Sequence, residues 1–234
     1  MGIEYQERYL LLWTPLHYAA MNGHEKVVDL LLLAGAFSNS KDFVYWFIGK
    51  CTPLHITAKN GRDKVVELLL QASAFINSED INTPLLDAAK IGHDKVIPLL
   101  LQAGAFIDSK NTYEITPLHD AAKNGHDKEY DHSSSRYSSN GHDKVIELLL
   151  QVGASVDSKD DNARSPLHYA ADNRRDKVVK LLLQAGELVD SIDKDKSTPL
   201  HKAACNGHDK EVELLLQAGA ILESKKTILA TFSG

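Results

Sequence analysis

Eleven histidines and two cysteines are the side chains in this 234-residue sequence with the clearest potential for chemistry. His201 and Cys205 are four residues apart, so on a helix they would share one face, and His208 follows closely. These are the ligand types of a zinc site. A closed zinc site needs four ligands, however, and a fourth is missing here. A structural role is the favoured interpretation, and we predict neither a metal nor a cofactor.

The histidines recur at two fixed positions, which indicates that an internal repeat places them. One set ends the tetrapeptide Thr-Pro-Leu-His or its variant Ser-Pro-Leu-His: His17, His55, His119, His168 and His201. A second set follows the glycine of a predicted turn: His24, His93, His126, His142 and His208. Only His132 lies outside this pattern, in a serine-rich insert. The histidines therefore point to a repeated scaffold rather than to an acid/base site.

The tetrapeptide marks six copies of the repeat. The copies begin at Thr14, Thr52, Thr83, Thr116, Ser165 and Thr198, and Thr83 opens the variant Thr-Pro-Leu-Leu. The interval is 33 residues from Thr83 to Thr116 and again from Ser165 to Thr198. The other intervals reflect one short unit and two insertions, near residues 38–51 and 124–139. A regular repeat of this length is typical of a solenoid.

The first half of each unit predicts a short helix. Thr116 supplies a hydroxyl N-cap and Pro117 occupies the first helical position, where a missing N–H costs nothing. Leu118, Ala121 and Ala122 follow at i, i+3 and i+4, so they form a narrow apolar stripe that permits close helix packing. An Asn-Gly pair then ends the helix, because glycine readily adopts the left-handed conformation at that position.

The second half predicts another helix and a polar turn. A segment of the type Asp-Lys-Val-Val-Glu-Leu-Leu-Leu begins with an acidic first turn, and Val65, Leu68 and Leu69 again have i, i+3, i+4 spacing. A Gly-Ala pair and a polar Asp-Ser-Lys-Asp segment close the unit, as at residues 153–160. Two such helices cannot bury their apolar faces alone, so neighbouring units must stack and share one core.

The six tetrapeptides, which we call anchors, and the similar sequences between them resemble the ankyrin repeat. The resemblance runs from about Thr14 to Ala220. It implies an all-α, ankyrin-type solenoid with β-hairpin fingers, and a concave surface of fingers and first helices that binds other proteins without chemistry of its own. It also implies that the anchor histidines hydrogen-bond within and between repeats. We expect a lead-in at residues 1–13, the repeat domain at 14–220 and a tail at 221–234.

Composition and motifs argue against several other classes. The net charge of −6 disfavours nucleic acid, and two cysteines 154 residues apart disfavour a disulfide-stapled secreted domain. No targeting or membrane-spanning segment is visible at the N-terminus, where the apolar run is short. Phosphate-binding loops and the common catalytic motifs are also missing from the sequence. We therefore predict a protein that is not an enzyme and binds neither membrane nor nucleic acid.

Partner binding is expected where the units differ from one another. On the first helices, the variable positions flank the paired small residues, with apolar groups in the first units and charge in the middle ones, such as Asp120 and Lys123. The predicted partner-binding residues are Tyr18, Met21, Phe43, Tyr45, Trp46, Phe47, Ile56, Lys59, Tyr113 and Tyr169. Solvent-facing variation without a binding role would give a similar pattern.

The first insertion contains an aromatic cluster at residues 43–48, and two interpretations of it stay open. Exposed aromatic residues on a finger are typical of contact sites. Alternatively, the finger folds back over the exposed edge of the first repeat, where Leu10, Leu11, Leu12 and Trp13 have no preceding helix to cover them. The two interpretations differ in whether the aromatic side chains affect binding or stability.

Two further local features carry expectations. The turn Asn-Gly-His-Asp-Lys is duplicated at Asn124 and Asn140, and only the second copy precedes an apolar stripe, so we expect it to start the second helix of that repeat.

Pro98 stands where other units have an acidic residue. With a helix cap at His93 or Asp94, this proline falls at the fourth or fifth helical position, where we expect it to bend or delay the helix and to weaken the third repeat.

The sequence thus predicts a non-catalytic protein-interaction module or adaptor that acts as a monomer. A second function remains open, in which the repeats are the substrate-recruiting or inhibitory segment of a larger multidomain enzyme. The expected compartment is the cytoplasm, with the nucleus or secretion into a host cell left open.

Overall fold

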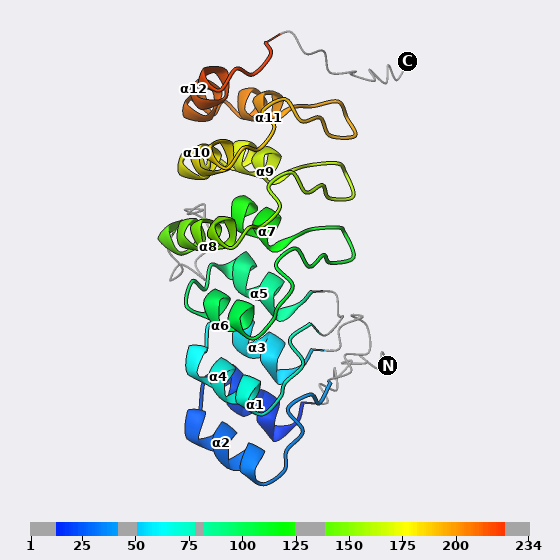
Figure 1. The fold of residues 1–234 in the computed structure, drawn as a ribbon, viewed down its shortest axis with the longest axis vertical. Coiled ribbons are helices and arrows are strands. Elements are labelled where there is room, and N and C mark those ends of the chain that lie inside the picture. The colour runs from blue at the N-terminus through cyan, green and yellow to red at the C-terminus, as the bar shows by residue number, and fades with distance from the viewer. Residues whose placement is uncertain (1–12, 42–50, 78–81, 125–138, 223–234) are drawn as a thin grey trace, which may run out of the picture.

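Six pairs of antiparallel helices stack into one elongated array in the computed structural model (Figure 1). The structure describes residues 13–41, 51–77, 82–124 and 139–222. The first helices of the pairs are α1 (Pro15–Asn22), α3 (Pro53–Lys59), α5 (Pro84–Ile91), α7 (Pro117–Lys123), α9 (Pro166–Asp172) and α11 (Pro199–Cys205). The second helices are α2 (Glu25–Leu33), α4 (Asp63–Gln71), α6 (Val96–Gln102), α8 (Ser139–Gln151), α10 (Asp176–Gln184) and α12 (Asp209–Gln217). The predicted all-α solenoid is confirmed.

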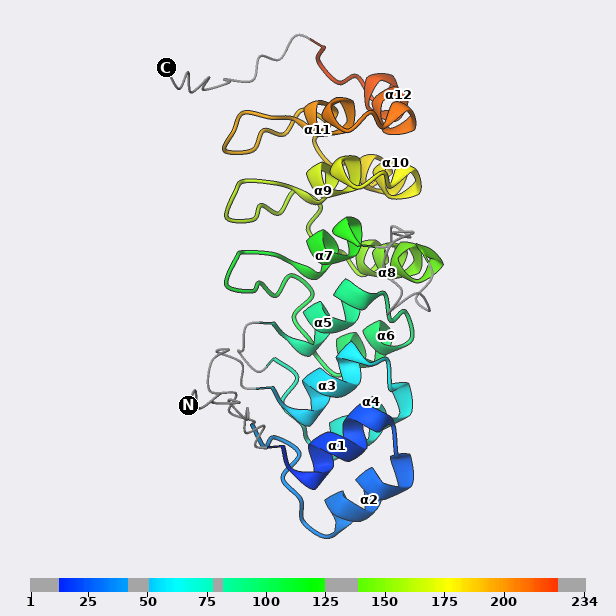
Figure 2. The same ribbon diagram turned by 180° about the vertical axis from the view of Figure 1, so that it is seen from behind.

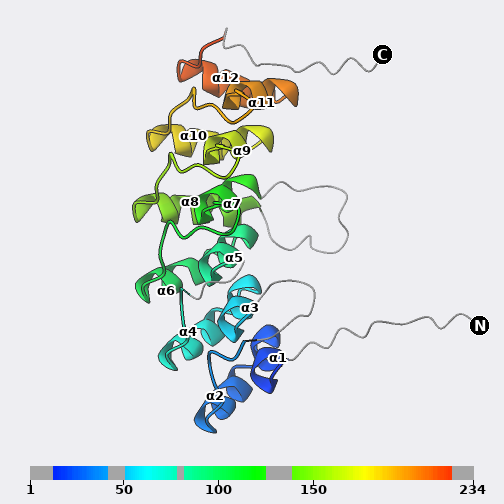
Figure 3. The same ribbon diagram turned by 90° about the vertical axis from the view of Figure 1, so that its right-hand side faces the viewer.

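First and second helices form two layers. The first helices lie on the side from which the fingers project, and the second helices lie on the opposite side (Figures 2 and 3). We call the surface made of first helices and fingers the inner face, and the surface of the second helices the outer face. Each first helix packs directly against the first helix of the next unit, which carries the array from one end to the other.

One continuous apolar core runs between the layers. Paired alanines such as Ala121 and Ala122 are fully buried and permit close approach of neighbouring first helices. Leu118 and the stripe residues Val65 and Leu69 are buried beside them. Because each unit packs its two helices against each other and also against the neighbouring units, stability depends on the stack as a whole.

The anchor histidines lock both the start of each first helix and the junction to the next unit. The Thr116 N–H donates to His119 Nδ1 over 3.3 Å, and the Thr116 hydroxyl accepts from the His119 N–H over 3.4 Å. His119 Nε2 lies 3.0 Å from the carbonyl oxygen of Arg164, the residue directly before the next unit, so the ring proton must reside on Nε2. His17, His55 and His168 make the same contact to the residue before the following unit. The implied bonds within and between repeats are confirmed.

The fingers are hairpin-shaped loops, and no described residue has strand conformation. In the finger of the fifth unit, the Asp160 N–H donates to the Arg164 carbonyl over 3.0 Å, and Asp160 Oδ1 accepts from the Asn162 and Arg164 N–H groups. This carboxylate closes the turn, so a single backbone pair suffices and a strand ladder does not develop. Adjacent fingers are joined by the Asp161 N–H, which donates to the Tyr113 carbonyl over 3.1 Å.

Pro98 does delay its helix, but its predicted position within the helix was wrong. Helix α6 begins at Val96, whereas α4, α10 and α12 begin at the aspartate two positions earlier in the unit. Pro98 is consequently the third residue of α6. At that position a backbone N–H has no hydrogen-bond partner within the helix, so the proline removes no hydrogen bond of the helix. The shift of the helix start absorbs most of the expected disruption.

The duplicated turn behaves as predicted in one respect and differently in another. The second copy does lead into the second helix of the fourth unit. Helix α8 already begins at Ser139, however, so the Asn-Gly-His turn residues at 140–142 form its first turn instead of preceding it. The first copy's continuation, residues 125–138, lies outside the described residues.

Candidate functional site

A row of three lysines crosses the inner face. Lys59, Lys90 and Lys123 occupy the same position at the C-terminal end of the first helix in three consecutive units, and we call them the lysine row. All three are exposed. None has a carboxylate within ion-pair distance among the described residues, whereas Lys64, Lys144, Lys177 and Lys202 all have one. The lysine row therefore presents unpaired positive charge.

The turn histidines fix the helix ends that carry this row. His93 Nε2 donates to the Lys59 carbonyl over 3.0 Å, and His142 Nε2 donates to the Lys90 carbonyl over 3.1 Å. Burial lowers the pKa of both histidines, which keeps them neutral near pH 7. The backbones of Lys59 and Lys90 are thus anchored by the following unit, while their ammonium groups extend into solvent.

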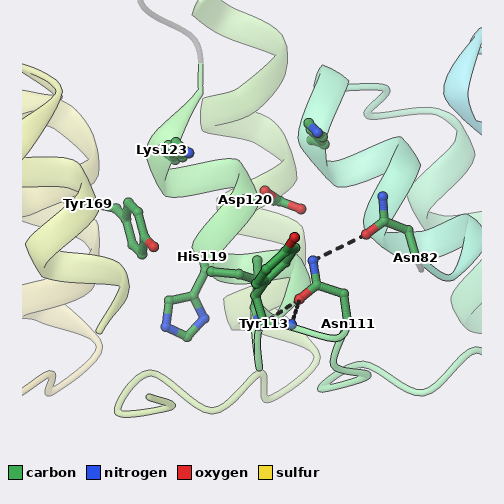
Figure 4. Close-up of a pocket in the computed structure, with 9 residues that line it drawn as sticks. Asn82, Asn111, Tyr113, His119, Asp120, Lys123 and Tyr169 are labelled. Carbon is green, nitrogen blue, oxygen red and sulfur yellow. Dashed lines mark hydrogen bonds between the residues drawn. The ribbon is translucent and has the colours of Figure 1, made fainter. Parts of the chain in front are cut away.

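A cavity opens beside the lysine row, between the third, fourth and fifth units (Figure 4). Its volume is about 210 Å³. It is lined by Asn82, Lys90, Asn111, Tyr113, Ile115, His119, Asp120, Lys123 and Tyr169. The cavity therefore combines two of the three lysines with aromatic and amide groups from the fingers.

Asp120 lies at the centre of this cavity, between Lys123 and Asn82 (Figure 4). It is only 9% exposed, and its carboxylate accepts no hydrogen bond from any described residue. Burial raises the pKa of Asp120 to about 6, against the opposing effect of the Lys90 and Lys123 charges. A buried carboxylate without a hydrogen-bond donor is costly, so it is a natural point of contact for a ligand.

The amide side chains of the cavity are already engaged. Asn82 Nδ2 donates to Asp87 Oδ1 over 3.1 Å, and Asn111 Nδ2 donates to Asn82 Oδ1 over 3.2 Å. Asn111 Oδ1 accepts from the Tyr113 and Ile115 N–H groups. The Asn82–Asp87 bond holds a finger against helix α5, and the other bonds fix the fingers themselves. The Asp120 carboxylate and the two ammonium groups make no such bond to a described residue.

Tyr169 forms one wall of the cavity and is buried. It is 8% exposed, and its hydroxyl donates to Asp160 Oδ2 over 2.7 Å. Burial and this bond raise its pKa far above the usual value. Its ring lies 5.7 Å from Lys123 Nζ, within the range of a cation–π contact. Tyr169 therefore positions Lys123 and offers little open surface of its own.

The other predicted partner-binding residues are in several different environments. Tyr18 is 49% exposed and Tyr113 is 64% exposed, both on the inner face, while Met21 is half-buried. Ile56 is 5% exposed, so it offers little open surface. The aromatic-finger residues Phe43, Tyr45, Trp46 and Phe47 lie outside the described residues.

The cavity brings together Tyr113 and Tyr169 from the predicted set, and it adds Lys90, Asp120 and Lys123. Lys59 belongs to the lysine row but does not line the cavity. The sequence contained a signal for Lys90, Asp120 and Lys123, because they occupy the variable positions of the first helices. Position alone did not distinguish a free charge from a paired one. The fold does so, since it leaves the lysine row unpaired and buries the aspartate.

The zinc interpretation of the C-terminal cluster gains no support from the positions of its residues. His201 Nδ1 lies 2.9 Å from the Thr198 hydroxyl, and His208 Nδ1 lies 2.9 Å from the Ala171 carbonyl oxygen. Cys205 is exposed and unpaired. Both histidines are thus engaged by the repeat scaffold. No helix within the described ranges is long and apolar enough to span a bilayer.

Comparison with known proteins gave a family and a fold. A family model described as ankyrin repeats (3 copies) matches residues 4–80, 54–129 and 135–228. The crystal structure of the human ASB11 ankyrin repeat domain is similar, with 27% sequence identity and a TM-score of 0.76. That likeness covers 92% of this chain and 88% of the other. No curated protein sequence gave a significant match.

Proposed function

This chain belongs to the ankyrin repeat family, and we propose that it is a non-catalytic module that binds a partner protein through its inner face. Ankyrin repeat domains generally mediate protein–protein interactions. The observation that supports the inner face here is the lysine row, three exposed charges without an ion pair among the described residues, two of which are anchored by inter-unit hydrogen bonds to their backbone carbonyls. Tyr18 and Tyr113 add exposed aromatic surface on the same face.

The proposed binding unit is the array of six repeats at residues 14–220, acting as a monomer. The anchor and turn histidines support a non-catalytic role, because their ring nitrogens are used to hold the helices and the unit junctions. Neither Cys51 nor Cys205 forms a disulfide within the described part of the chain, which is consistent with a reducing compartment, and we place the protein in the cytoplasm.

A capture experiment with matched variants tests this function. The immobilised chain would be compared with an inner-face variant carrying Tyr18→Ser, Lys59→Glu and Tyr113→Ser. The control carries Leu30→Ser, Lys64→Glu and Val152→Ser, which change exposed residues on and beside the second helices. Proteins captured from a cell extract would be quantified by mass spectrometry, and circular dichroism would confirm that all three chains fold.

We expect the inner-face variant to lose specific partners that the parent and the outer-face control both retain. Exposed aromatic and charged residues near the centre of an interface commonly carry most of its binding free energy. If the inner-face variant captures the same proteins as the parent, or if only the outer-face variant loses them, the proposed binding face is wrong.

A further inference from the structure

The chemistry of the inner face defines the kind of partner segment that would fit it. The lysine row presents three cations from consecutive units, and no carboxylate of the described residues neutralises any of them within 4.0 Å. Exposed charges of one sign attract a segment of the opposite sign and orient it. The row therefore favours an acidic segment over a basic or a purely apolar one.

The spacing of the row sets the spacing of the acidic residues. Helices α3, α5 and α7 pack directly against one another, and packed helices are about 8–10 Å apart. A segment in the extended polyproline II conformation rises about 3.1 Å per residue and has three residues per turn, so every third side chain points the same way and lies about 9 Å further along. Carboxylates at every third position of an extended segment can therefore face Lys59, Lys90 and Lys123 in turn.

The cavity supplies a second, independent indication of a ligand. The Asp120 carboxylate is nine-tenths buried, lines the cavity together with Lys90 and Lys123, and accepts no hydrogen bond from a described residue. A carboxylate that enters beside it would find two ammonium donors. When Asp120 is protonated it also becomes a hydrogen-bond donor, and the two carboxyl groups can share that proton.

We propose that the lysine row and the cavity bind an extended acidic segment of the partner, with carboxylates at every third residue and one of them inserted between Lys90 and Lys123. This inference rests on the proposed function and names the chemistry of the partner. It assigns Asp120 the role of a proton-dependent contact in the floor of the site.

The groups around Asp120 make it the one expected to change charge near pH 6. Helix α5 contributes Lys90 and Asp87, and the Asp87 carboxylate is hydrogen-bonded to Asn82. Its own helix contributes His119, whose pKa is lowered by burial, and Lys123. Helix α9 contributes Tyr169, which stays neutral, and the finger contributes Tyr113. Binding of an acidic segment should therefore strengthen as the pH falls through about 6, because protonated Asp120 no longer repels it.

The probe for this proposal is a fluorescein-labelled twelve-residue peptide with glutamate at every third position and serine or glycine elsewhere. Two control peptides keep the same length. One has glutamine in place of each glutamate, and the other has its glutamates in one block. Affinities are measured by fluorescence anisotropy at about 50 mM salt, where the Debye length exceeds 10 Å and surface charges act strongly.

Charge-matched protein variants locate the binding face. The test variant carries Lys59→Gln, Lys90→Gln and Lys123→Gln. The control carries Lys64→Gln, Lys95→Gln and Lys144→Gln, which removes the same charge from the second half of the same three units. We expect the test variant to lose about tenfold or more in affinity for the glutamate peptide and the control to change by about twofold or less.

Asp120→Asn tests the cavity. We expect it to raise affinity several-fold at pH 7.5 and to remove the gain that the parent shows between pH 7.5 and pH 5.5. Asp29→Asn, on the outer helix α2, should leave both the affinity and its pH dependence unchanged. A melting curve by circular dichroism is recorded for every variant to confirm that it folds. The comparison between the glutamate peptide and its two control peptides uses the parent protein and therefore does not depend on any variant.

The proposal is overturned if the glutamine peptide binds as well as the glutamate peptide, or if the two lysine variants behave alike. If the affinity of Asp120→Asn for the glutamate peptide keeps the pH dependence of the parent, the cavity is not part of the binding site. A partner that is captured through the inner face but is indifferent to the lysine variant would overturn the acidic segment while leaving the binding module in place.

Discussion

Replacing Glu187 with glutamine should stabilise the array by an amount that increases with pH. Glu187 occupies the position at which the other five units have alanine, and it is 5% exposed. Oε1 accepts a hydrogen bond from the Leu167 N–H over 2.9 Å, but Oε2 has no hydrogen-bond partner among the described residues. Burial raises the pKa of Glu187 from an ordinary 4.5 to about 8. The nearby Lys159 opposes this shift only weakly, and its own buried ammonium group makes no hydrogen bond within the described part of the chain.

The sign and size of the effect follow from proton linkage. The folded state holds the Glu187 proton more tightly than the unfolded state, so the Glu187 contribution to stability declines as the pH rises from 4.5 to about 8. One pKa unit corresponds to about 1.4 kcal/mol, which gives a loss of roughly 2–3 kcal/mol between pH 5.5 and 7.5. Glutamine keeps an acceptor for the Leu167 N–H and cannot ionise, so the variant avoids this loss.

Urea titrations of both proteins at pH 5.5, 6.5 and 7.5 measure the difference. The advantage of Glu187→Gln should grow by roughly 2–3 kcal/mol over this range. Taking the difference between the two proteins cancels the titration of the histidines. Glu213→Gln, an exposed glutamate on α12, is the matched control and should show no such growth. A pH-independent advantage for Glu187→Gln, or none, would refute the reasoning.

Three other predictions concern the scaffold. Pro98→Glu should raise the free energy of unfolding by only about 1 kcal/mol or less, since the proline lies in the first turn of α6. A gain near 3 kcal/mol in urea titrations would show that the proline still breaks the helix. His168→Gln should cost about 1–3 kcal/mol at pH 7 through loss of the bond to the Ser197 carbonyl. It should also flatten the loss of stability as the pH falls from 6.5 towards 4, because the buried ring has its pKa lowered to about 4; an equally acid-sensitive variant in parallel titrations contradicts this. Deleting residues 124–139 should leave stability unchanged or slightly higher, since closing a loop of this length opposes folding by about 1 kcal/mol; a large loss of helicity by circular dichroism would show that the insert is packed.

The architecture was predictable because local chemistry and tertiary packing agree in every unit. A threonine or serine followed by proline marks the start of all six first helices, and each helix begins at that proline. The anchor histidine adds a contact that sequence alone could not specify, the bond from Nε2 to the carbonyl directly before the next unit. The resemblance to the family supplied that expectation, and the His119 and His168 contacts confirm it.

The expectations for Tyr169 and for the start of α6 differ from the structure, in each case because of one identifiable side chain. Tyr169 was expected to be open to a partner, but Asp160 of the preceding finger binds its hydroxyl and holds it in the wall of the cavity. The start of α6 was misplaced because the proline moves the helix start and leaves the unit otherwise intact. Asp120 and the lysine row were visible as variable positions. Their free charge depends on which carboxylates the fold brings near, and spacing in the sequence does not contain that information.

Lysine footprinting of the complex with a captured partner tests the central claim most directly. The chain alone and the complex would be acetylated under identical conditions, and the modification of each lysine quantified by mass spectrometry. Lys64, Lys95 and Lys144 on the other side of the same units serve as internal references. If the inner face binds the partner, Lys59, Lys90 and Lys123 should become several-fold less reactive while the reference lysines keep their reactivity. Protection of the reference lysines with an unchanged lysine row would contradict the account.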